Sequence, residues 1–307
     1  MASKSYYGNF LLKSTPDVSI ILPAKNEAAS LAELLPAIRS SISDAEIIVC
    51  DDGSEDETAT VCEANKVVRI YHPYSKGNGA AVKSGALAAT GDYLVMLDAD
   101  GQHSPSDIAA LVEKLDEGFD MVVAARDFSS QATLSRGIAN TFYNKFASLV
   151  TGQKIKDLTS GMRAVKRRAF LQFLPLLPNG FSYPSTITMA FFRSGYNVAY
   201  LPVKVRQRNG KSHLRPLQDG VRFLLIIFKL TILYSPLKIF FPIAVAQAAV
   251  GLGYYAYTYF SDGRFTNMGV TLLISALTIF LIGLVSEQIT MLLYSRLNAD
   301  SGSNHNQ

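Results

Sequence analysis

The chain has 307 residues, which is long enough for one large domain or two smaller ones. Its formal net charge of +4 is too small to indicate nucleic-acid binding, and no block of Lys and Arg interleaved with aromatic residues occurs. The two cysteines, Cys50 and Cys62, lack a metal-binding spacing, so nothing in the sequence requires a metal–thiolate site or an oxidising compartment.

Short apolar segments alternate with amphipathic ones over the first 126 residues. Strands are predicted at 18–22, 46–50, 67–71, 93–97 and 121–124, and helices at 27–39, 55–65, 79–89 and 105–117. Asn26 is a plausible N-cap of the first helix. This βαβ alternation predicts an α/β fold with a mostly parallel sheet covered by helices on both faces.

The next segment is less regular. Helices are predicted at 135–150, 167–173 and 185–193, the last ended by Gly195, and a late strand at 198–205. We expect residues 1–214 to form one domain.

The composition then changes to that of a membrane protein. Ile239 to Phe260 contains no charged residue and, as a helix, is roughly 33 Å long, enough to cross a bilayer. Met268 to Leu293 is a second apolar stretch, interrupted only by Glu287. We therefore predict a transmembrane hairpin over 237–296, followed by a polar tail, 297–307. Gly251, Gly253 and Gly283 could pack within one hairpin or between copies, so a homo-oligomer is possible.

Basic residues predict the orientation of this hairpin. Arg264 lies alone in the connecting turn, whereas the other side carries Arg222, Lys229, Lys238 and Arg296. The positive-inside bias places both termini and the first domain in the cytoplasm. Residues 215–236 combine polar positions on one face with Leu, Ile, Phe and Val, which favours an amphipathic interfacial helix.

Acidic residues follow three of the predicted strands. Asp98 and Asp100 come directly after the strand at 93–97, and side chains two residues apart in a strand point the same way. Paired carboxylates suit Mg²⁺ or Mn²⁺, especially when phosphates complete the coordination shell. Glu27 and Asp52 follow the first and second strands, and the carboxyl ends of parallel strands form the ligand-binding edge of an open α/β sheet. We expect one common ligand pocket there.

Six segments in this order resemble the motifs of family 2 glycosyltransferases with the GT-A fold, in particular the dolichyl-phosphate mannose synthase and polyprenyl-phosphate glycosyltransferase branch. They are Pro23-Ala24-Lys25-Asn26-Glu27, Asp51-Asp52-Gly53-Ser54, Gly77-Asn78-Gly79-Ala80-Ala81, Asp98-Ala99-Asp100-Gly101-Gln102-His103, Asp157-Leu158-Thr159-Ser160-Gly161-Met162-Arg163 and Arg208-Asn209-Gly210-Lys211-Ser212. The resemblance covers roughly residues 18–214.

The resemblance implies a role for each matching residue. The donor-binding residues would be Pro23, Ala24, Asn26, Glu27, Asp52, Gly53 and Asp98, with Ala24, Glu27 and Asp52 against the nucleoside. Asp98 and Asp100, with Gln102, would hold the metal. Arg126 and Arg136 would bind the acceptor phosphate, and Ser160 and Arg208 donor or acceptor phosphate, although the spacing also allows Arg206. Asp157 would lie near the reacting centre, either as a base or as an orienting group.

The implied activity is inverting, metal-dependent transfer of one sugar from a UDP- or GDP-sugar to polyprenyl phosphate at the cytoplasmic membrane face. A phosphate with a second pKa near 6 is already nucleophilic at neutral pH, so positioning should matter more than a strong base. One alternative is a processive polysaccharide synthase, which is disfavoured because the chain has no tryptophan for the late motif of those enzymes and only two predicted spans. Another is a membrane-bound protein that binds nucleotide-sugar without turnover.

Overall fold

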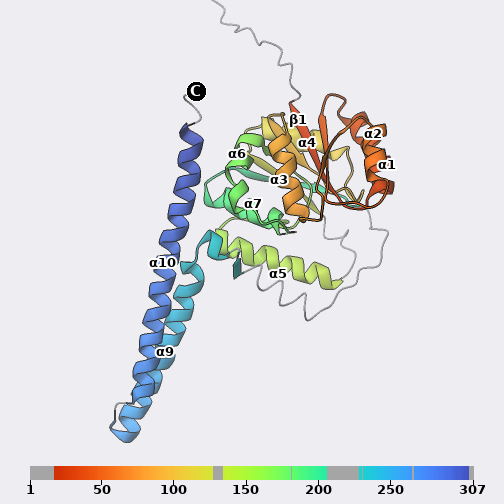
Figure 1. Cartoon of the computed structure of the whole chain (residues 1–307). Coiled ribbons are helices and arrows are strands. Elements are labelled where there is room, and N and C mark those ends of the chain that lie inside the picture. The colour runs from red at the N-terminus through yellow and green to blue at the C-terminus, as the bar shows by residue number, and fades with distance from the viewer. Residues whose placement is uncertain are drawn as a thin grey trace, which may run out of the picture.

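The computed structural model describes residues 17–126, 134–180, 182–205, 228–229, 231–264 and 266–303 (Figure 1). For residues 134–140, 142, 262 and 298–303 it describes the backbone alone. The described chain forms an α/β domain and a long helical hairpin that extends away from it.

A seven-stranded sheet in the order β3-β2-β1-β4-β6-β5-β7 is the centre of the α/β domain. The strands are β1 (Val18–Ala24), β2 (Glu46–Asp51), β3 (Val68–Tyr71), β4 (Tyr93–Met96), β5 (Met121–Arg126), β6 (Arg163–Lys166) and β7 (Val198–Val203). β6 pairs antiparallel with β4 and β5, whereas the other paired strands are parallel. The mostly parallel sheet is thus confirmed, while β6 was not predicted.

Helices cover both faces of the sheet because adjacent strand residues point to opposite sides. Ile20 packs with α1 (Ala28–Ser41), α2 (Thr58–Ala64) and α4 (Asp107–Asp116) in one hydrophobic core. Its neighbour Ile21 packs with α3 (Asn78–Ala88), α6 (Arg167–Gln172) and α7 (Tyr183–Arg193) in a second core. A 3-10 turn, η2 (Leu174–Leu176), follows α6. The domain therefore has three layers, as the sequence predicts.

Asn26 does not cap α1, contrary to the sequence prediction. It has a left-handed backbone with φ +56°, and its side-chain carbonyl accepts the Glu55 amide at 2.8 Å. Its own amide donates to Ser54 Oγ at 3.0 Å. The capping role falls instead to Asp56, whose carboxylate accepts the Ala28 amide at 2.9 Å. Asn26 thus connects the β1–α1 turn to the loop after β2 through two hydrogen bonds.

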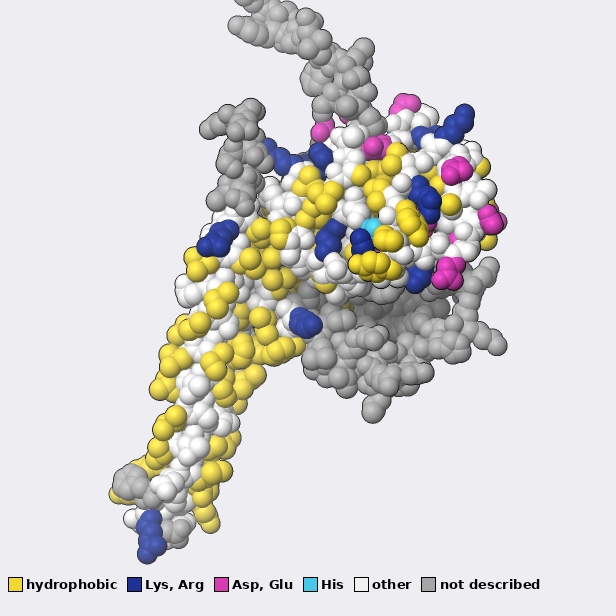
Figure 2. Space-filling model, viewed as in Figure 1, with side chains coloured by type: hydrophobic (Ala, Val, Ile, Leu, Met, Phe, Trp, Pro, Cys, Tyr) yellow, Lys and Arg dark blue, Asp and Glu magenta, His cyan; other side chains and the backbone are white. Residues whose placement is uncertain are grey.

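The hairpin consists of α9 (Leu237–Asp262) and α10 (Asn267–Ser303), joined by a turn in which Gly263 ends α9 with φ +62°. Both helices are long and apolar enough to cross a membrane, yet only 11% and 17% of their most apolar stretches are buried in the protein. Figure 2 shows hydrophobic side chains along the hairpin, with basic side chains near its ends. A core helix of a soluble protein would bury these side chains. The exposed apolar surface of the hairpin is therefore suited to contact with lipid.

Two of the three hairpin glycines pack within the hairpin. A Cβ on Gly251 would lie 3.1 Å from Leu272 Cβ, and one on Gly283 would lie 2.6 Å from Phe240 Cβ, so both glycines allow α9 and α10 to approach closely. Gly253 meets nothing within 4 Å. Of the two alternatives that the sequence left open, the contacts of Gly251 and Gly283 correspond to packing within one hairpin.

The helix α5 (Leu134–Thr151) lies beneath the sheet, next to the base of the hairpin (Figure 1). Tyr143, Ala147 and Val150 pack with Met189 of α7 and Tyr234 in a third hydrophobic cluster. Most of the predicted interfacial helix, 215–236, lies outside the described residues. Helix α10 continues through Ser303, so the first part of the predicted polar tail is helical.

Candidate active site

The acidic segments gather at one edge of the sheet, as the sequence predicts. β1 is parallel to β2 and to β4, and β5 runs in the same direction as β4 because both are antiparallel to β6. The carboxyl ends of these four strands therefore meet at the same edge, which is the ligand-binding edge of open α/β sheets. Asp52 and Asp98 follow β2 and β4, and Arg126 is the last residue of β5.

Asp98 and Asp100 lie close enough to repel one another. Burial, and next the charge of Asp100, raise the pKa of Asp98 to about 6. Both residues are partly exposed, and Asp100 lines the groove between α1 and the loop after β4, whereas Asp98 is not one of the residues that line it. Two neighbouring carboxylates supply oxygen donors of the kind that hard divalent cations prefer.

Gly161 lets the Asp98 carboxylate occupy its place. A Cβ on Gly161 would lie 2.5 Å from Asp98 Cγ and would overlap Asp98 Oδ2. Any other residue at this position would therefore have to displace the carboxylate. The sequence includes Gly161 in a motif, but only the folded chain shows that it touches Asp98.

Asp157 is paired with Arg126 at the end of β5. Its Oδ2 accepts Arg126 Nε at 2.7 Å and its Oδ1 accepts Arg126 Nη2 at 2.9 Å. The Arg126 and Thr159 amides also donate to the carboxylate, at 3.2 and 3.1 Å. Burial alone would raise the pKa of Asp157, but these hydrogen bonds outweigh burial and hold the pKa below its ordinary value.

Arg163 is fully buried behind this site, at the start of β6. Its guanidinium donates to the backbone carbonyls of Ser160 and Pro184 at 2.5 and 2.8 Å, and to Thr188 Oγ1 at 3.1 Å. Arg163 thereby fixes the Ser160–Gly161 turn against α7. The sequence analysis places Arg163 in a motif without a role, and its contacts with α7 carry no signal in the sequence.

Asp52 organises a loop rather than facing open solvent. Its Oδ1 accepts His72 Nδ1 and the Lys76 amide, and its Oδ2 accepts Ser75 Oγ and the Gly77 amide, at 2.7–2.8 Å. These hydrogen bonds lower the pKa of Asp52 to about 2, against the opposing effect of burial, which is the largest single influence. Since both oxygens are engaged, the carboxylate holds residues 72–77 in place beside the N-terminus of α3.

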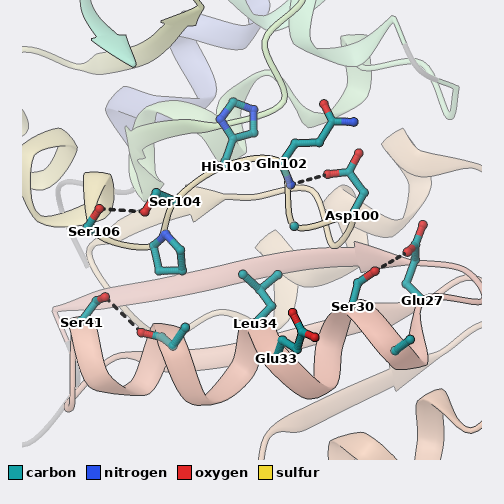
Figure 3. Close-up of a pocket in the computed structure, with 14 residues that line it drawn as sticks. Glu27, Ser30, Glu33, Leu34, Ser41, Asp100, Gln102, His103, Ser104 and Ser106 are labelled. Atoms are coloured by element: carbon teal, nitrogen blue, oxygen red, sulfur yellow. Dashed lines mark hydrogen bonds between the residues drawn. The ribbon is translucent and has the colours of Figure 1, made fainter. Parts of the chain in front are cut away.

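A groove of about 610 Å³ runs between α1 and the loop that follows β4. Glu27, Asp100 and Gln102 lie at one end of it, and Ser41, Ser104 and Ser106 at the other (Figure 3). Glu27 accepts a hydrogen bond from Ser30 Oγ at 3.1 Å. The structure thus brings together three predicted site residues, Glu27, Asp100 and Gln102, in one groove.

His103 belongs to this loop but its imidazole points away from α1 (Figure 3). Burial, and next the charge of Arg126, lower the pKa of His103 to about 4, so the ring is neutral at physiological pH. Its Nδ1 is buried without a hydrogen-bond partner among the residues that the structure describes. It is therefore a neutral polar group on the Arg126 side of the site.

The donor set fits a hard divalent cation shared with a phosphorylated ligand. Within the described ranges no three His, Cys, Asp or Glu side chains group as in a metal site made wholly of protein. Asp98 and Asp100 are two oxygen donors, and Asp100 Oδ1 accepts the Gln102 amide at 3.2 Å, which directs the loop around them. Mg²⁺ and Mn²⁺ are bound in this manner, with one or two carboxylates and phosphate oxygens.

The remaining predicted residues differ in how far the structure places them. Pro23 and Ala24 are buried at the end of β1, and the Ala24 carbonyl accepts the Asp52 amide at 2.8 Å. Gly53 has φ +75° in the turn after β2. Ser160 is fully buried and its hydroxyl donates to the Met162 carbonyl at 3.4 Å, so its side chain does not reach the cleft surface. Arg206, Arg208 and the side chain of Arg136 lie outside the described part of the chain.

The chain is similar to several curated glycosyltransferases. It is 28% identical over 250 residues to "Glycosyltransferase AglJ" from Haloferax volcanii, an alignment that covers 79% of this chain and 82% of that protein. It is 33% identical over 184 residues to "Undecaprenyl-phosphate 4-deoxy-4-formamido-L-arabinose transferase" from Klebsiella pneumoniae, and 35% identical to the enzyme of that name from Shewanella sediminis. These two alignments cover 54% of this chain but only 56% and 55% of the relatives.

Solved structures support the fold. A glucosyl-3-phosphoglycerate synthase from Mycobacterium tuberculosis, in complex with Mn²⁺, UDP and glucosyl-3-phosphoglycerate, matches with a TM-score of 0.57 and 22% identity, over 70% of this chain and 80% of that one. At this identity the match shows the GT-A-like architecture alone.

Two family models match separate parts of the chain. Residues 235–292 match the "GtrB C-terminal hairpin", which corresponds to most of α9 and α10. Residues 19–174 match "Glycosyl transferase family 2", which covers the sheet edge that carries Asp52, Asp98, Asp100 and Arg126. The chain is therefore a member of glycosyl transferase family 2.

Proposed function

We propose that this protein transfers one sugar from a nucleotide-sugar to polyprenyl phosphate at the membrane surface, with inversion at the anomeric carbon. The observation that carries the proposal is the acidic pair Asp98/Asp100 next to Arg126, on a domain joined to a lipid-exposed hairpin. The names of two relatives, both undecaprenyl-phosphate sugar transferases, support polyprenyl phosphate as the acceptor. The positive-inside bias supports a cytoplasmic α/β domain and cytoplasmic termini.

In this reaction the bond between the anomeric carbon and the donor diphosphate breaks while a new bond to an acceptor phosphate oxygen forms. The nucleoside diphosphate leaves with the bonding electron pair. Asp98 and Asp100, with Gln102, would hold Mg²⁺ or Mn²⁺, which supplies positive charge to the departing diphosphate. The Mn²⁺ and UDP in the solved relative support a divalent metal and a nucleotide donor.

Arg126 would bind phosphate in this site. Its planar guanidinium suits phosphate oxygens, and Asp157 fixes two of its nitrogens, Nε and Nη2, while its side chain remains 26% exposed. Because Asp157 is already saturated with hydrogen bonds, we assign it to the orientation of Arg126 rather than to proton abstraction. Asp52 would shape the donor site through the loop at 72–77.

The direct test uses the purified full-length protein in liposomes that contain undecaprenyl or dolichyl phosphate. A panel of labelled UDP- and GDP-sugars is added with Mg²⁺ or Mn²⁺, and label in the lipid extract is counted. We expect one donor to give a lipid-linked sugar whose anomeric configuration, determined by NMR, is opposite to that of the donor. Failure of every donor to label either lipid would overturn the proposal.

Replacing Asp157 with Asn separates its two possible roles. We expect kcat/KM to fall by about 10- to 100-fold, since Arg126 loses its charged partner, while the shape of the pH–rate profile stays the same. The wild-type carboxylate is ionised throughout the assay range because its pKa is lowered, so orientation by Asp157 adds no titration step. The measurement is kcat/KM between pH 6 and pH 9. Loss of a rising acidic limb in the variant would instead identify Asp157 as the base.

A further inference from the structure

An ion pair joins the α/β domain to the hairpin. Arg193, the last residue of α7, donates from Nη2 to Glu287 Oε1 of α10 at 2.9 Å. The other carboxylate oxygen, Oε2, accepts Ser235 Oγ at 3.1 Å and the Leu237 amide at 3.2 Å. Glu287 thus holds together α7, the segment before α9 and the first residue of α9. We call this group of four residues the membrane joint.

Aromatic rings shield the joint from water. The Arg193 guanidinium lies 5.7 Å from the centroid of the Tyr234 ring and 5.9 Å from that of Tyr294, within cation–π distance. The Arg193 and Glu287 side chains are only 21% and 16% exposed. Neutralising one partner of a pair this shielded destabilises the contact between α7 and α10, because the remaining charge is left without compensation.

The joint lies at the level where the hairpin should leave the hydrocarbon. Glu287 is twenty residues beyond Asn267, the start of α10, which corresponds to roughly 30 Å of helix, about the thickness of a hydrocarbon core. Beyond it, Tyr294 packs against Phe173 of the α/β domain, with ring centroids 6.4 Å apart. Beyond Glu287, one side of α10 therefore contacts the α/β domain, while Ile289, Met291 and Leu292 remain exposed.

A rigid helix connects the joint to the acidic site. At the N-terminal end of α7, the Pro184 carbonyl and the Thr188 hydroxyl hold Arg163, which in turn holds the Ser160 carbonyl next to Gly161 and Asp98. The residues of α7 from Tyr183 to Phe191 are all buried, so this helix has no freedom to move alone. Its C-terminal end is Arg193. Displacement of Arg193 should consequently move the acidic site relative to the bilayer.

We propose that Arg193 and Glu287 are positioning residues that fix the height and tilt of the active site above the membrane. This inference rests on the proposed function, because the height matters only for an acceptor whose phosphate is held at the bilayer surface. An acceptor that diffuses freely in detergent does not need the joint. The joint therefore affects the use of membrane-bound acceptor and leaves donor binding unchanged.

Glu287→Gln tests this directly, because Gln keeps the shape and loses the charge. In liposomes we expect the KM for long-chain polyprenyl phosphate to rise by about 3- to 30-fold, the range expected for a coupling element outside both sites. With a short-chain, detergent-soluble polyprenyl phosphate we expect kcat and KM within about twofold of wild type, and likewise the donor KM. Arg193→Lys, with Glu287 intact, keeps the charge pair and should retain most of the wild-type affinity for the long-chain acceptor. Glu117→Gln, which breaks an exposed pair with Lys114, is the matched control.

A second measurement needs no turnover. A dye is attached to Glu63→Cys, at an exposed position of α2, and energy transfer reports its distance from dye-labelled lipid headgroups. The native Cys50 and Cys62 are buried, so the dye reacts with the introduced cysteine. We expect one efficiency population in the otherwise wild-type protein, and a broadened or second population with Glu287→Gln.

If Glu287→Gln changes neither the KM for the long-chain acceptor nor the distribution of energy-transfer efficiencies, the proposed positioning role of the membrane joint is wrong. Equal losses with long and short acceptors would also overturn it, since they indicate general damage. If the wild-type protein transfers sugar to neither acceptor, the proposed function fails. The energy-transfer result then still decides whether Glu287 orients the domain.

Discussion

Replacing Asp100 with Asn is expected to lower sugar transfer by at least about 100-fold, because the loss of one of two carboxylates removes several kcal/mol of metal-dependent stabilisation of the departing diphosphate. Asn keeps the size of the side chain and an oxygen that can accept the Gln102 amide, so the loop after β4 should retain its shape. Asp100 is partly exposed in the groove with Glu27, which limits the effect on stability.

Two measurements distinguish this result from unfolding. Mn²⁺ binding in the presence of UDP or GDP, followed by calorimetry, should weaken by more than about tenfold in the variant, since a hard cation loses an anionic oxygen ligand. The melting temperature, followed with a maleimide dye that reacts when the buried Cys50 and Cys62 become accessible, should stay close to that of wild type. Asp44→Asn, at an exposed turn, is the control and should change neither quantity.

Full transfer activity in Asp100→Asn, with Mn²⁺ binding unchanged, would remove Asp100 from the metal site. Lost Mn²⁺ binding with retained transfer would mean that the metal is not required. Retained nucleotide-sugar binding with no transfer by the wild-type protein would instead support a protein that binds the donor without turnover.

The acidic edge of the sheet could be predicted because it depends on local rules. Asp98 and Asp100 follow an apolar strand two residues apart, and parallel strands bring their carboxyl ends together whatever the rest of the fold does. The hairpin could be predicted for a similar reason, since length and the absence of charge decide whether a helix can span a bilayer. The two family models match residues 19–174 and 235–292, the ranges that contain these two segments.

The roles of side chains that depend on distant partners could not be predicted. Asp157 pairs with Arg126, which is 31 positions away, and only this pairing reveals that its carboxylate is saturated. Asp52 resembles a ligand-binding residue in the sequence, yet its four partners come from the loop at 72–77. Tertiary hydrogen bonds of this kind leave no periodic signal along the chain.

β6 was missed because its four residues, Arg163–Lys166, begin and end with a cation and show no alternation. Its antiparallel insertion between β4 and β5 brings Gly161 and Arg163 to the acidic site. Glu287 is the one charged residue in the second predicted span. It lies against the first residue of α9, but its charged partner, Arg193, belongs to the α/β domain.

Gly161→Ala should reduce transfer as severely as a direct change of Asp98, although position 161 carries no functional group. The added methyl would lie 2.5 Å from Asp98 Cγ, and Arg163 holds the neighbouring Ser160 carbonyl, so the glycine cannot retreat and the carboxylate must move. We expect a loss of at least about 100-fold in transfer, and about 1–3 kcal/mol of stability lost to overpacking. Gly180→Ala is the matched control, because a Cβ there meets nothing within 4 Å.

A double mutant shows whether Gly161 acts through Asp98. If the methyl group works only by displacing the carboxylate, Gly161→Ala combined with Asp98→Asn should be little slower than either single variant, since both remove the same interaction. Independent effects would multiply, giving a double variant at least about 10⁴-fold slower than wild type. Multiplying effects, or a Gly161→Ala enzyme with normal Mn²⁺ binding, would mean that the close approach of Gly161 to Asp98 does not set the geometry of the acidic pair.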